Sequence, residues 1–588
     1  MADFFLSHKN ATYNHTRIIS RFNASGVALH RIFQLSNWEL ILFENKKTLA
    51  ANFLVDELNR KTFICGTLIY KSLPLNDSLK QLHFDHYSKQ IDDKALLGNF
   101  CVIFYNGKNI NILLDNLGVR QIFQSEDGLV ISTSFLAILQ SSPKKFKINH
   151  LALSEKLATG FLIGEDTLVG GIKKASGKLP FPVPLNDVEI INSKKHPTQI
   201  ESHNKGINKS IEVQIEILSS HFQAINNAFP NYQGDLGLSS GFDCRLILAL
   251  ANKEINTPLH IHSHNTLGVH DTEIFYAKQL AEITGVDLHL VPTQSLEGTS
   301  NENIEKVLDQ NLYFFDGRTG RHLGAYSETY TPDYRKNSMG DAAYSLNGLG
   351  GEIFRDSYFL GNKVLNWDDW ARRFLFYPLL TESLGSEKQA KDLSYMLKRK
   401  IEVELNMDFS EADLFKTHAY YGLVKMPQAN GTIAQAYGKV SHFLFPFIEF
   451  NIVTEALRAI PYLGTGGAYQ AKLISRISPE LAAIGSHYGT SFDKLTLKYL
   501  LWGKLKTIGS VKTRNTLVRK KLLKRANKEF HIKLIKKINE TPVLLQAKEA
   551  ILSHAPYVVF DKLLLDNTQR RYIIYLGHFL NRLSPYFD

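Results

Sequence analysis

A short apolar strand that turns into a helix through serine and glycine is the feature that most restricts the fold of this chain. Residues 234–245 read Gly-Asp-Leu-Gly-Leu-Ser-Ser-Gly-Phe-Asp-Cys-Arg, and an apolar run follows at once. The pattern predicts a strand over 235–239 and a helix over 243–252. Free backbone N–H groups at the start of such a helix attract an anion, so the turn is a predicted phosphate site. A serine-capped helix without a ligand is the alternative.

Side chains in this turn extend the prediction from phosphate to a nucleotide with a metal ion. Ser239, Ser240 and Cys244 add hydroxyl and thiol donors, and Gly241 allows a close backbone approach. Asp243 would repel bare phosphate unless a cation lay between them, which indicates ATP with Mg²⁺. The turn is not a Walker loop, because no Gly-Lys-Ser/Thr follows the glycine.

Strand and helix patterns alternate after the turn and predict an α/β fold. A strand over 258–263, a helix over 272–285 and a strand over 287–291 follow one another. This alternation is typical of a parallel sheet with crossover helices, which binds ligands at the carboxyl ends of its strands. Ser263, at the end of the second strand, is therefore added to the predicted nucleotide site.

A second strand that ends in glycines and an acid lies at residues 344–354, Tyr-Ser-Leu-Asn-Gly-Leu-Gly-Gly-Glu-Ile-Phe. Asn347 and Gly348, where this strand ends, are predicted to contact the nucleotide. A glycine-rich loop with a solvated glutamate is the alternative.

The chain of 588 residues is long enough to divide into domains. Strand patterns at 63–70, 100–105 and 110–114 make the N-terminal part rich in β-structure, and the polar, turn-rich stretch 160–205 reads as a linker. We expect domains at 1–200, 205–500 and 501–588, the last one basic and helical.

The two glycine-rich motifs resemble those of the asparagine synthetase family, which includes β-lactam synthetases and lasso-peptide cyclases. Residues 239–244 are similar to its Ser-Gly-Gly-x-Asp-Ser loop, with Ser240 and Cys244 as departures, and residues 347–354 are similar to its Ser-Gly-x-Gly-Ser-Asp-Glu-Leu-Phe segment. In the second segment the family's aspartate helps the acid of the first loop to hold Mg²⁺, and the matching residue here is Glu352, so the resemblance implies that Asp243 and Glu352 are the metal ligands. Mg²⁺ takes only one or two protein carboxylates and completes its shell with phosphate and water. The resemblance also implies an Ntn-hydrolase-like β-rich domain. An ATP-pyrophosphatase-type parallel-sheet domain, of the adenine nucleotide α-hydrolase kind, and a helical C-terminal part would follow it.

The N-terminal part resembles the class II glutamine amidotransferase domain of that family at residues 97–100, 114–120 and 131–134. In that domain an N-terminal cysteine attacks glutamine, and its own α-amine acts as the base. This chain has Ala2 at that position, and Cys65 and Cys101 have no free α-amine to use. We therefore expect a domain that does not hydrolyse glutamine.

The resemblance implies an ATP-dependent amide ligase that forms AMP and pyrophosphate. A small-molecule or peptide carboxylate would be adenylated, and ammonia or an amine, from the substrate or a partner protein, would attack it. His442 stands where the family has a glutamate and is the candidate base, with a packed histidine as the alternative. Lys472 is the candidate cation at the leaving pyrophosphate, with Arg355 and Lys439 in reserve.

The formal charge of +11 comes from one stretch, because residues 501–540 hold thirteen Lys and Arg against two Glu. RNA, an anionic membrane surface, an acidic substrate and a solvated helical face all fit such a stretch. Few aromatic residues are interleaved with the charges, which disfavours a nucleic-acid partner.

Three scattered cysteines, no basic and apolar leader, and no apolar run long enough to cross a bilayer favour a cytoplasmic protein without a membrane span. Two other functions stay open. Ser240, Cys244, Leu349 and Ala2 all depart from the active pattern, as in an ATP-binding regulatory protein without turnover. Amidation of a sugar acid in surface-polysaccharide synthesis, without glutamine, is the other. The sequence leaves the oligomeric state open.

Overall fold

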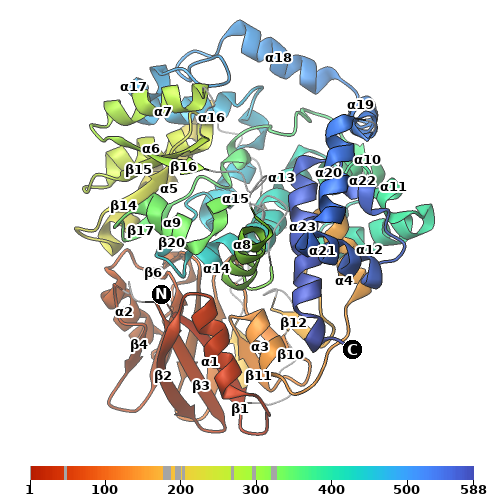
Figure 1. Cartoon of the computed structure of the whole chain (residues 1–588). Helices are drawn as coiled ribbons and strands as arrows, with labels where there is room; N and C mark the ends of the chain where they lie inside the picture. Colours follow the sequence, from red (N-terminus) through yellow and green to blue (C-terminus); the bar gives the residue numbers. More distant parts are fainter. Residues whose placement is uncertain are drawn as a thin grey trace.

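Two sheets form most of the N-terminal region of the computed structural model (Figure 1), the first antiparallel and the second antiparallel except for one parallel pair of strands at its edge. The structure describes residues 2–45, 49–175, 187–191, 200, 206–266, 271–293, 300–318, 328–526 and 528–588. In the first sheet the strand order is β12 (Ile172–Lys174), β10 (Phe123–Ser125), β11 (Val130–Ser132), β1 (Ala2–His8), β3 (Trp38–Glu44) and β2 (Ala28–Leu35). In the second it is β13 (Val188–Ile191), β9 (Ile110–Leu114), β8 (Phe100–Tyr105), β5 (Lys61–Gly66) and β4 (Phe53–Val55).

Both faces of the second sheet are covered, which explains the continuous apolar sequence of β8. Cys101 and Ile103 belong to the core shared with the first sheet, while Val102 and Phe104 belong to a core formed with α2 (Leu75–Tyr87). Alternate residues of a strand point to opposite faces, so a strand covered on both sides is apolar throughout. The predicted strands over 100–105 and 110–114 are confirmed as β8 and β9, and they pair as a hairpin with Tyr105 opposite Ile110.

Two predictions for this region are wrong in detail. The strand expected over 63–70 divides into β5 and β6 (Ile69–Tyr70), because Gly66, the last residue of β5, has a φ of +96°, which is outside the extended region. The expected linker 160–205 contributes β12 and β13, which lie at edges of the two sheets. The rest of that linker, apart from residues 160–175, 187–191 and 200, lies outside the described residues.

A five-stranded parallel sheet follows and confirms the predicted α/β alternation. Its strand order is β16 (Leu288–Thr293), β15 (His260–Thr266), β14 (Gly234–Gly237), β17 (Tyr344–Leu346) and β20 (His442–Leu444). The chain moves outward from β14 on one side and then continues at β17 on the other. Such a change of direction leaves a crevice beyond the carboxyl ends of the two central strands. Each predicted glycine-rich motif follows one of these strands.

Helices flank this sheet and make up the C-terminal part. They include α5 (Gly206–Ala228), α6 (Phe242–Glu254), α7 (Thr272–Ile283), α9 (Pro332–Met339), α15 (Phe450–Arg458) and α16 (Ala468–Ile477). The C-terminal series is α18 (Leu497–Ile508), α19 (Val511–Arg525), α20 (Glu529–Glu540), α21 (Pro542–His554), α22 (Phe560–Leu563) and α23 (Asn567–Arg582). The predicted boundary at 501 therefore falls inside a helix.

The C-terminal helices are attached to the rest of the chain. Nε2 of His578 on α23 lies 2.8 Å from a carboxylate oxygen of Asp309 on α8 (Asn301–Phe314), and Arg582 donates to the other oxygen at 2.8 Å. In Figure 1, α18 lies at the end of the molecule opposite the N-terminal sheets. None of the helices in the described part of the chain combines the length and the apolar run that crossing a bilayer requires.

Candidate functional site

A crevice of about 510 Å³ lies where the sheet topology predicts one. Its floor is formed by the ends of the central strands, including Gly237, His262 and Ser345, and its rim includes Ser239 and Glu352. Residues of η4 (Tyr421–Asn430), a π-helix, line another wall. Irregular helices of this kind are frequent at functional sites.

Asp243 and Glu352 both lie beside the guanidinium of Arg355 in this region. Arg355 donates to both carboxylate oxygens of Asp243, at 2.6 and 3.0 Å, and its guanidinium lies 3.8 Å from Glu352. Asp243 lies in the first turn of α6 and Glu352 in the short helix η3 (Gly351–Phe354). The two predicted metal ligands are thus brought together, and a reserve candidate of the sequence lies between them.

The charges of Asp243, Glu352 and Arg355 interact strongly, because these groups are mostly buried. Burial raises the pKa of Asp243, and the charge of Glu352 raises it further against the lowering effect of Arg355. Burial alone would lower the pKa of Arg355, but the Asp243 carboxylate outweighs this and raises it. The guanidinium is therefore a fixed positive charge.

Two glycines of the second motif allow the loops to approach. A Cβ at Gly348 would lie 3.2 Å from the Cβ of Asp243, and a Cβ at Gly351 would overlap its carboxylate. The close approach of the two loops therefore requires glycine at both positions.

The helix that begins in the predicted phosphate loop, α6, has no side-chain cap at its start. Gly241 is the N-cap of α6 and makes no side-chain cap hydrogen bond. Ser239 lines the crevice, and its Oγ accepts from the N–H of Gly241 at 3.3 Å. Ser240 is buried and its Oγ lies 2.7 Å from Nδ1 of His487, so it supports the loop from behind. Burial raises the pKa of the Cys244 thiol to about 11.

The remaining predicted nucleotide contacts lie on or beside the crevice. Ser263 lines it and donates from Oγ to the carbonyl of Leu238. Asn347 lines it as well, and its Oδ1 accepts from the N–H of Leu349 at 2.9 Å. Gly348 lies against Asp243, as described above.

Sequence reasoning missed two partners of the acid pair. Gln470 on α16 donates to Asp243 at 2.9 Å and accepts from Arg355 at 2.6 Å. The hydroxyl of Tyr421, on η4, donates to Glu352. Burial and then the Glu352 charge hold the pKa of Tyr421 well above its usual value, which keeps this hydroxyl protonated. No local signal marked either residue, since both contacts are formed across the fold.

Lys472 and His442 lie outside the crevice. Lys472 is exposed, two positions after Gln470 and so on the opposite side of α16. His442 pairs with Tyr344 at the amino end of β20, whereas the crevice lies beyond the carboxyl ends. It is buried, its Nδ1 lies 3.0 Å from Thr67 Oγ1, and burial holds its pKa well below the usual value. The expected base is thus corrected to a packed histidine.

A different histidine reaches the floor of the crevice. Nδ1 of His262 lies 2.7 Å from Oδ1 of Asp235, and the other carboxylate oxygen accepts from Arg335 and Ser345, both at 2.8 Å. Burial raises the pKa of Asp235, but Arg335 and the hydrogen bonds outweigh it and lower the pKa, so the group is a carboxylate. We call Asp235 and His262 the floor pair. The signal in the sequence was the alternating histidines of residues 260–264.

His260 adds a possible third metal ligand, because one ligand atom of each of Asp235, His260 and His262 lies within 4.8 Å of the others. The carboxylate already accepts three hydrogen bonds, and Nε2 of His260 lies 3.1 Å from the carbonyl of Ser338. The cluster is satisfied as a hydrogen-bond network without an ion.

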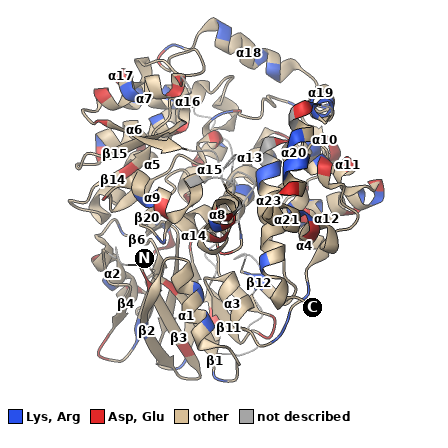
Figure 2. Ribbon diagram, in the orientation of Figure 1, with Lys and Arg blue, Asp and Glu red and all other residues tan. Residues whose placement is uncertain are grey.

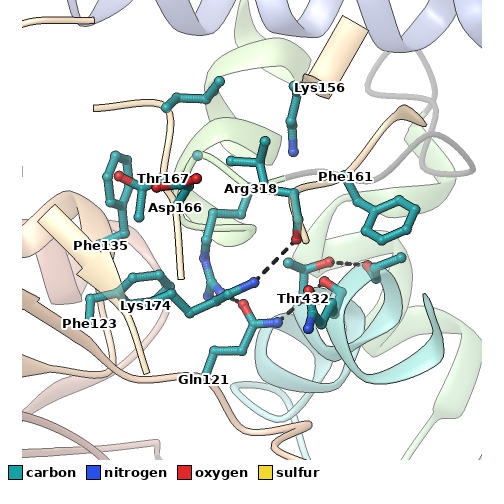
Figure 3. Close-up of a pocket in the computed structure, with 15 residues that line it drawn as sticks. Gln121, Phe123, Phe135, Lys156, Phe161, Asp166, Thr167, Lys174, Arg318 and Thr432 are labelled. Atoms are coloured by element: carbon teal, nitrogen blue, oxygen red, sulfur yellow. Dashed lines mark hydrogen bonds between the residues drawn. The ribbon is translucent and has the colours of Figure 1, made fainter. Parts of the chain in front are cut away.

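A second, smaller cavity of about 50 Å³ lies between the N-terminal region and η4 (Figure 3). Lys156, Lys174 and Arg318 line it. Arg318 donates to the side-chain oxygens of Gln121 at 2.7 Å and Gln435 at 2.9 Å, so it links the N-terminal region to α14 (Gly431–Tyr437), the helix that follows η4. Burial, followed by repulsion from Arg318 and Lys174, lowers the pKa of Lys156 to about 7.

Lys439, the other reserve candidate for the cation at the leaving pyrophosphate, contributes to packing as Arg318 does. Lys439 is buried, donates to the carbonyl of Phe314 at 2.9 Å and has its pKa lowered to about 7 by burial. Neither Arg318 nor Lys439 is among the residues that line the crevice.

Comparison of the chain with protein-family models and with curated proteins finds no match.

Proposed function

We propose that this protein is an ATP-dependent amide ligase that adenylates a substrate carboxylate, releases pyrophosphate and joins the acyl group to ammonia or an amine. The observation that carries the proposal is the convergence of Asp243 and Glu352, each just after a central parallel strand, on the guanidinium of Arg355 beside the crevice that Glu352 lines. The ATP-pyrophosphatase type of fold and the Ntn-hydrolase type of the N-terminal region are part of this proposal.

The residues at the crevice fit a magnesium ion and a nucleotide. Two carboxylates against one guanidinium leave a net negative charge when all three are ionised, which suits a divalent cation. The uncapped N–H groups at the start of α6 suit phosphate oxygens. When bound, Mg²⁺ would neutralise phosphate charge at this point, and Asp243 and Glu352 would hold it.

The chain's own groups divide the remaining work. Ser239 and the N-terminus of α6 would hold phosphate, and Ser263 and Asn347 would contact the nucleoside side of the crevice. Arg355, which stays charged, would replace Lys472 as the cation beside the leaving pyrophosphate.

His262 replaces His442 as the proposed proton acceptor. A neutral imidazole beside the Asp235 carboxylate carries its proton on Nδ1, which leaves the lone pair of Nε2 for the crevice. As the C–N bond forms and the C–O bond to AMP breaks, Nε2 would take the proton from the attacking nitrogen. Asp235 acts through His262 by fixing its ring and tautomer.

The N-terminal region would be a platform without glutaminase activity. Cys65 and Cys101 lie in the core between its sheets, where burial raises the pKa of Cys65 to about 12 and that of Cys101 well above its usual value. The thiolate is the reacting form of cysteine, so these environments oppose nucleophilic attack. The nitrogen would come from free ammonia, a partner protein or the substrate itself.

Exchange of labelled pyrophosphate into ATP tests the first half-reaction. The protein is incubated with ATP, Mg²⁺, labelled pyrophosphate and each of a panel of amino acids, peptides and sugar acids. We expect exchange that depends on one class of carboxylate, and its loss in Asp243→Asn. Lys472→Gln is the matched control, because that side chain is exposed and faces away. Wild-type protein that binds ATP but supports no exchange with any carboxylate would contradict the proposal.

Two observations favour a second candidate, an ATP-binding regulatory protein without turnover. Arg355 already occupies both oxygens of Asp243, and Ser240 faces His487 and not the crevice. For this candidate, ATP would bind and stabilise the fold, while AMP would not form with any carboxylate.

A further inference from the structure

Helix α18 presents a row of large apolar side chains to solvent. Leu497, Leu501, Leu505 and Ile508 are 77, 56, 63 and 75 % exposed, and the neighbouring Trp502 is 58 % exposed. The spacing of four, four and three residues places the four aliphatic side chains on one side of the helix. We call these five residues the α18 stripe. Contiguous exposed apolar groups mark an interaction surface.

The opposite side of α18 is fixed to the body of the protein, so the stripe faces outward permanently. A Cβ at Gly503 would lie 2.7 Å from Cγ2 of Thr465, which shows how closely the helix approaches. Lys363 donates to the carbonyl groups of Thr507 and, at 2.9 Å, of Gly509 at the end of the helix. In the described structure, the rest of the chain therefore does not cover the stripe.

Positive charge surrounds the stripe. Lys498, Lys504 and Lys506 of α18 are exposed, as are Lys512, Lys520, Lys521 and Lys524 of α19. Figure 2 shows Lys and Arg along α18, α19 and α20. Because residues 501–540 carry the whole excess charge of the chain, the field around the stripe is cationic.

We propose that the α18 stripe binds the surface of an anionic lipid bilayer. Leucine, isoleucine and tryptophan on one side of a helix, flanked by lysine, are the composition of helices that lie in the membrane interface. The apolar side chains enter the boundary between headgroups and acyl chains, and the lysines contact headgroup phosphates. Each cation near an anionic leaflet adds attraction, which salt weakens.

Two other occupants fit the stripe less well. Single-stranded nucleic acid stacks its bases on aromatic rings, and four of the five stripe residues are aliphatic. A second copy of this chain would bring an equal cationic field against the first, which opposes association through this surface. The proposal does not depend on the function proposed for the crevice.

Vesicle binding tests the proposal with the full-length protein. We expect co-sedimentation with phosphatidylcholine vesicles that contain about 30 % phosphatidylglycerol, roughly tenfold weaker binding to phosphatidylcholine alone, and weakening by salt. Trp38, Trp367 and Trp370 are buried, so the emission shift on binding reports Trp502. A blue shift with anionic vesicles is the expected result.

Leu501→Glu/Leu505→Glu should weaken vesicle binding by at least roughly tenfold, because two charges replace apolar contacts with the interface. Leu58→Glu is the matched control, since Leu58 is 73 % exposed in the N-terminal region. Unchanged melting temperatures establish that the variants fold. The proposal is wrong if the wild type does not bind anionic vesicles, or if the double variant binds them as tightly as the wild type and Leu58→Glu do. It is also wrong if the double variant instead abolishes a dimer or RNA binding.

Discussion

The guanidinium of Arg355 donates to both carboxylate oxygens of Asp243, at 2.6 and 3.0 Å. The same guanidinium lies 3.8 Å from Glu352, and the two side chains of the close pair are only 14 and 22 % exposed. A divalent ion on these acids must share Asp243 with Arg355 or displace it. We therefore expect Arg355 to stabilise the fold and to weaken the binding of a metal ion.

Arg355→Gln should destabilise the fold. Removing one partner of a buried ion pair costs about 3–5 kcal/mol, and the partial exposure of this pair lowers the expected loss to about 2 kcal/mol. Unfolding in urea measures it. Asp243→Asn/Arg355→Gln is the control, because it removes both charges and should lose less. Equal losses in the single and double variants would show that the pairing does not matter.

The same Arg355→Gln variant should bind Mg²⁺ more tightly than the wild type in the absence of nucleotide. Two carboxylates then face the ion without a competing guanidinium, and a gain of roughly tenfold corresponds to about 1.4 kcal/mol. Titration calorimetry measures this affinity, with Lys472→Gln as a control that should behave as the wild type. Unchanged affinity would remove Asp243 and Glu352 as metal ligands.

Cys65 and Cys101 should not react with iodoacetamide in the native protein at neutral pH. They are opposite each other on β5 and β8, fully buried, and their raised pKa values keep both thiols protonated. Peptide mapping after alkylation measures the reaction, and in denaturant both should be labelled. The pure protein should also release no glutamate from glutamine. Appreciable glutamate release would contradict the proposed role of the N-terminal region.

Local sequence was sufficient for the elements that carry the site. The strand and helix on either side of 238–241 were predicted because apolar residues, glycine and serine follow one another in a pattern that depends on neighbours in the chain. Glu352 was predicted to meet Asp243 because residues 347–354 resemble a family segment whose acid shares Mg²⁺ with the acid of the first loop, and both motifs follow strands of a parallel sheet, which share one carboxyl edge. The structure brings these two side chains together at Arg355.

Contacts formed between distant segments were not predictable. Gln470 reaches Asp243 over 227 positions, and the floor pair spans 27. The prediction for His442 was wrong for a related reason. His442 is the first residue of β20, so it lies at the amino edge of the sheet, whereas the crevice lies beyond the carboxyl edge.

Glu449 should make stability fall as pH rises. It is buried before α15, accepts from the N–H of Gly98 at 2.9 Å, and has its pKa raised well above the usual value by burial and then by Asp115. The native state therefore holds a proton that the unfolded chain loses near its ordinary pKa of about 4.3. This contribution is complete below that pKa and is lost as pH increases toward the folded value.

Glu449→Gln is neutral at every pH and keeps the acceptor for Gly98. Its free energy of unfolding should exceed that of the wild type more at about pH 8 than at about pH 5. Urea unfolding at both values gives the difference, and Glu189→Gln, at an exposed site on β13, should show none. A pH-independent difference would mean that Glu449 stays ionised in the folded protein.

His262→Gln should separate the two halves of the proposed reaction. Pyrophosphate exchange with the carboxylate identified in the exchange assay should persist, while amide formation with ammonia should fall by about 10²–10⁴, the usual contribution of a general base. Hydroxylamine, a weakly basic nucleophile, should still trap the acyl group, and added imidazole should restore part of the rate. Asp235→Asn should lower amide formation in the same way, since its single oxygen would face the donors Arg335 and Ser345 and its NH2 group would face Nδ1 of His262, which favours the wrong tautomer.

His289→Gln is the matched control, because His289 lies opposite His262 on the neighbouring strand but is exposed and does not line the crevice. It should keep both half-reactions. If His262→Gln forms amide at the wild-type rate, the floor pair does not accept the proton. If it also abolishes exchange while its melting temperature is unchanged, His262 serves nucleotide or carboxylate binding instead.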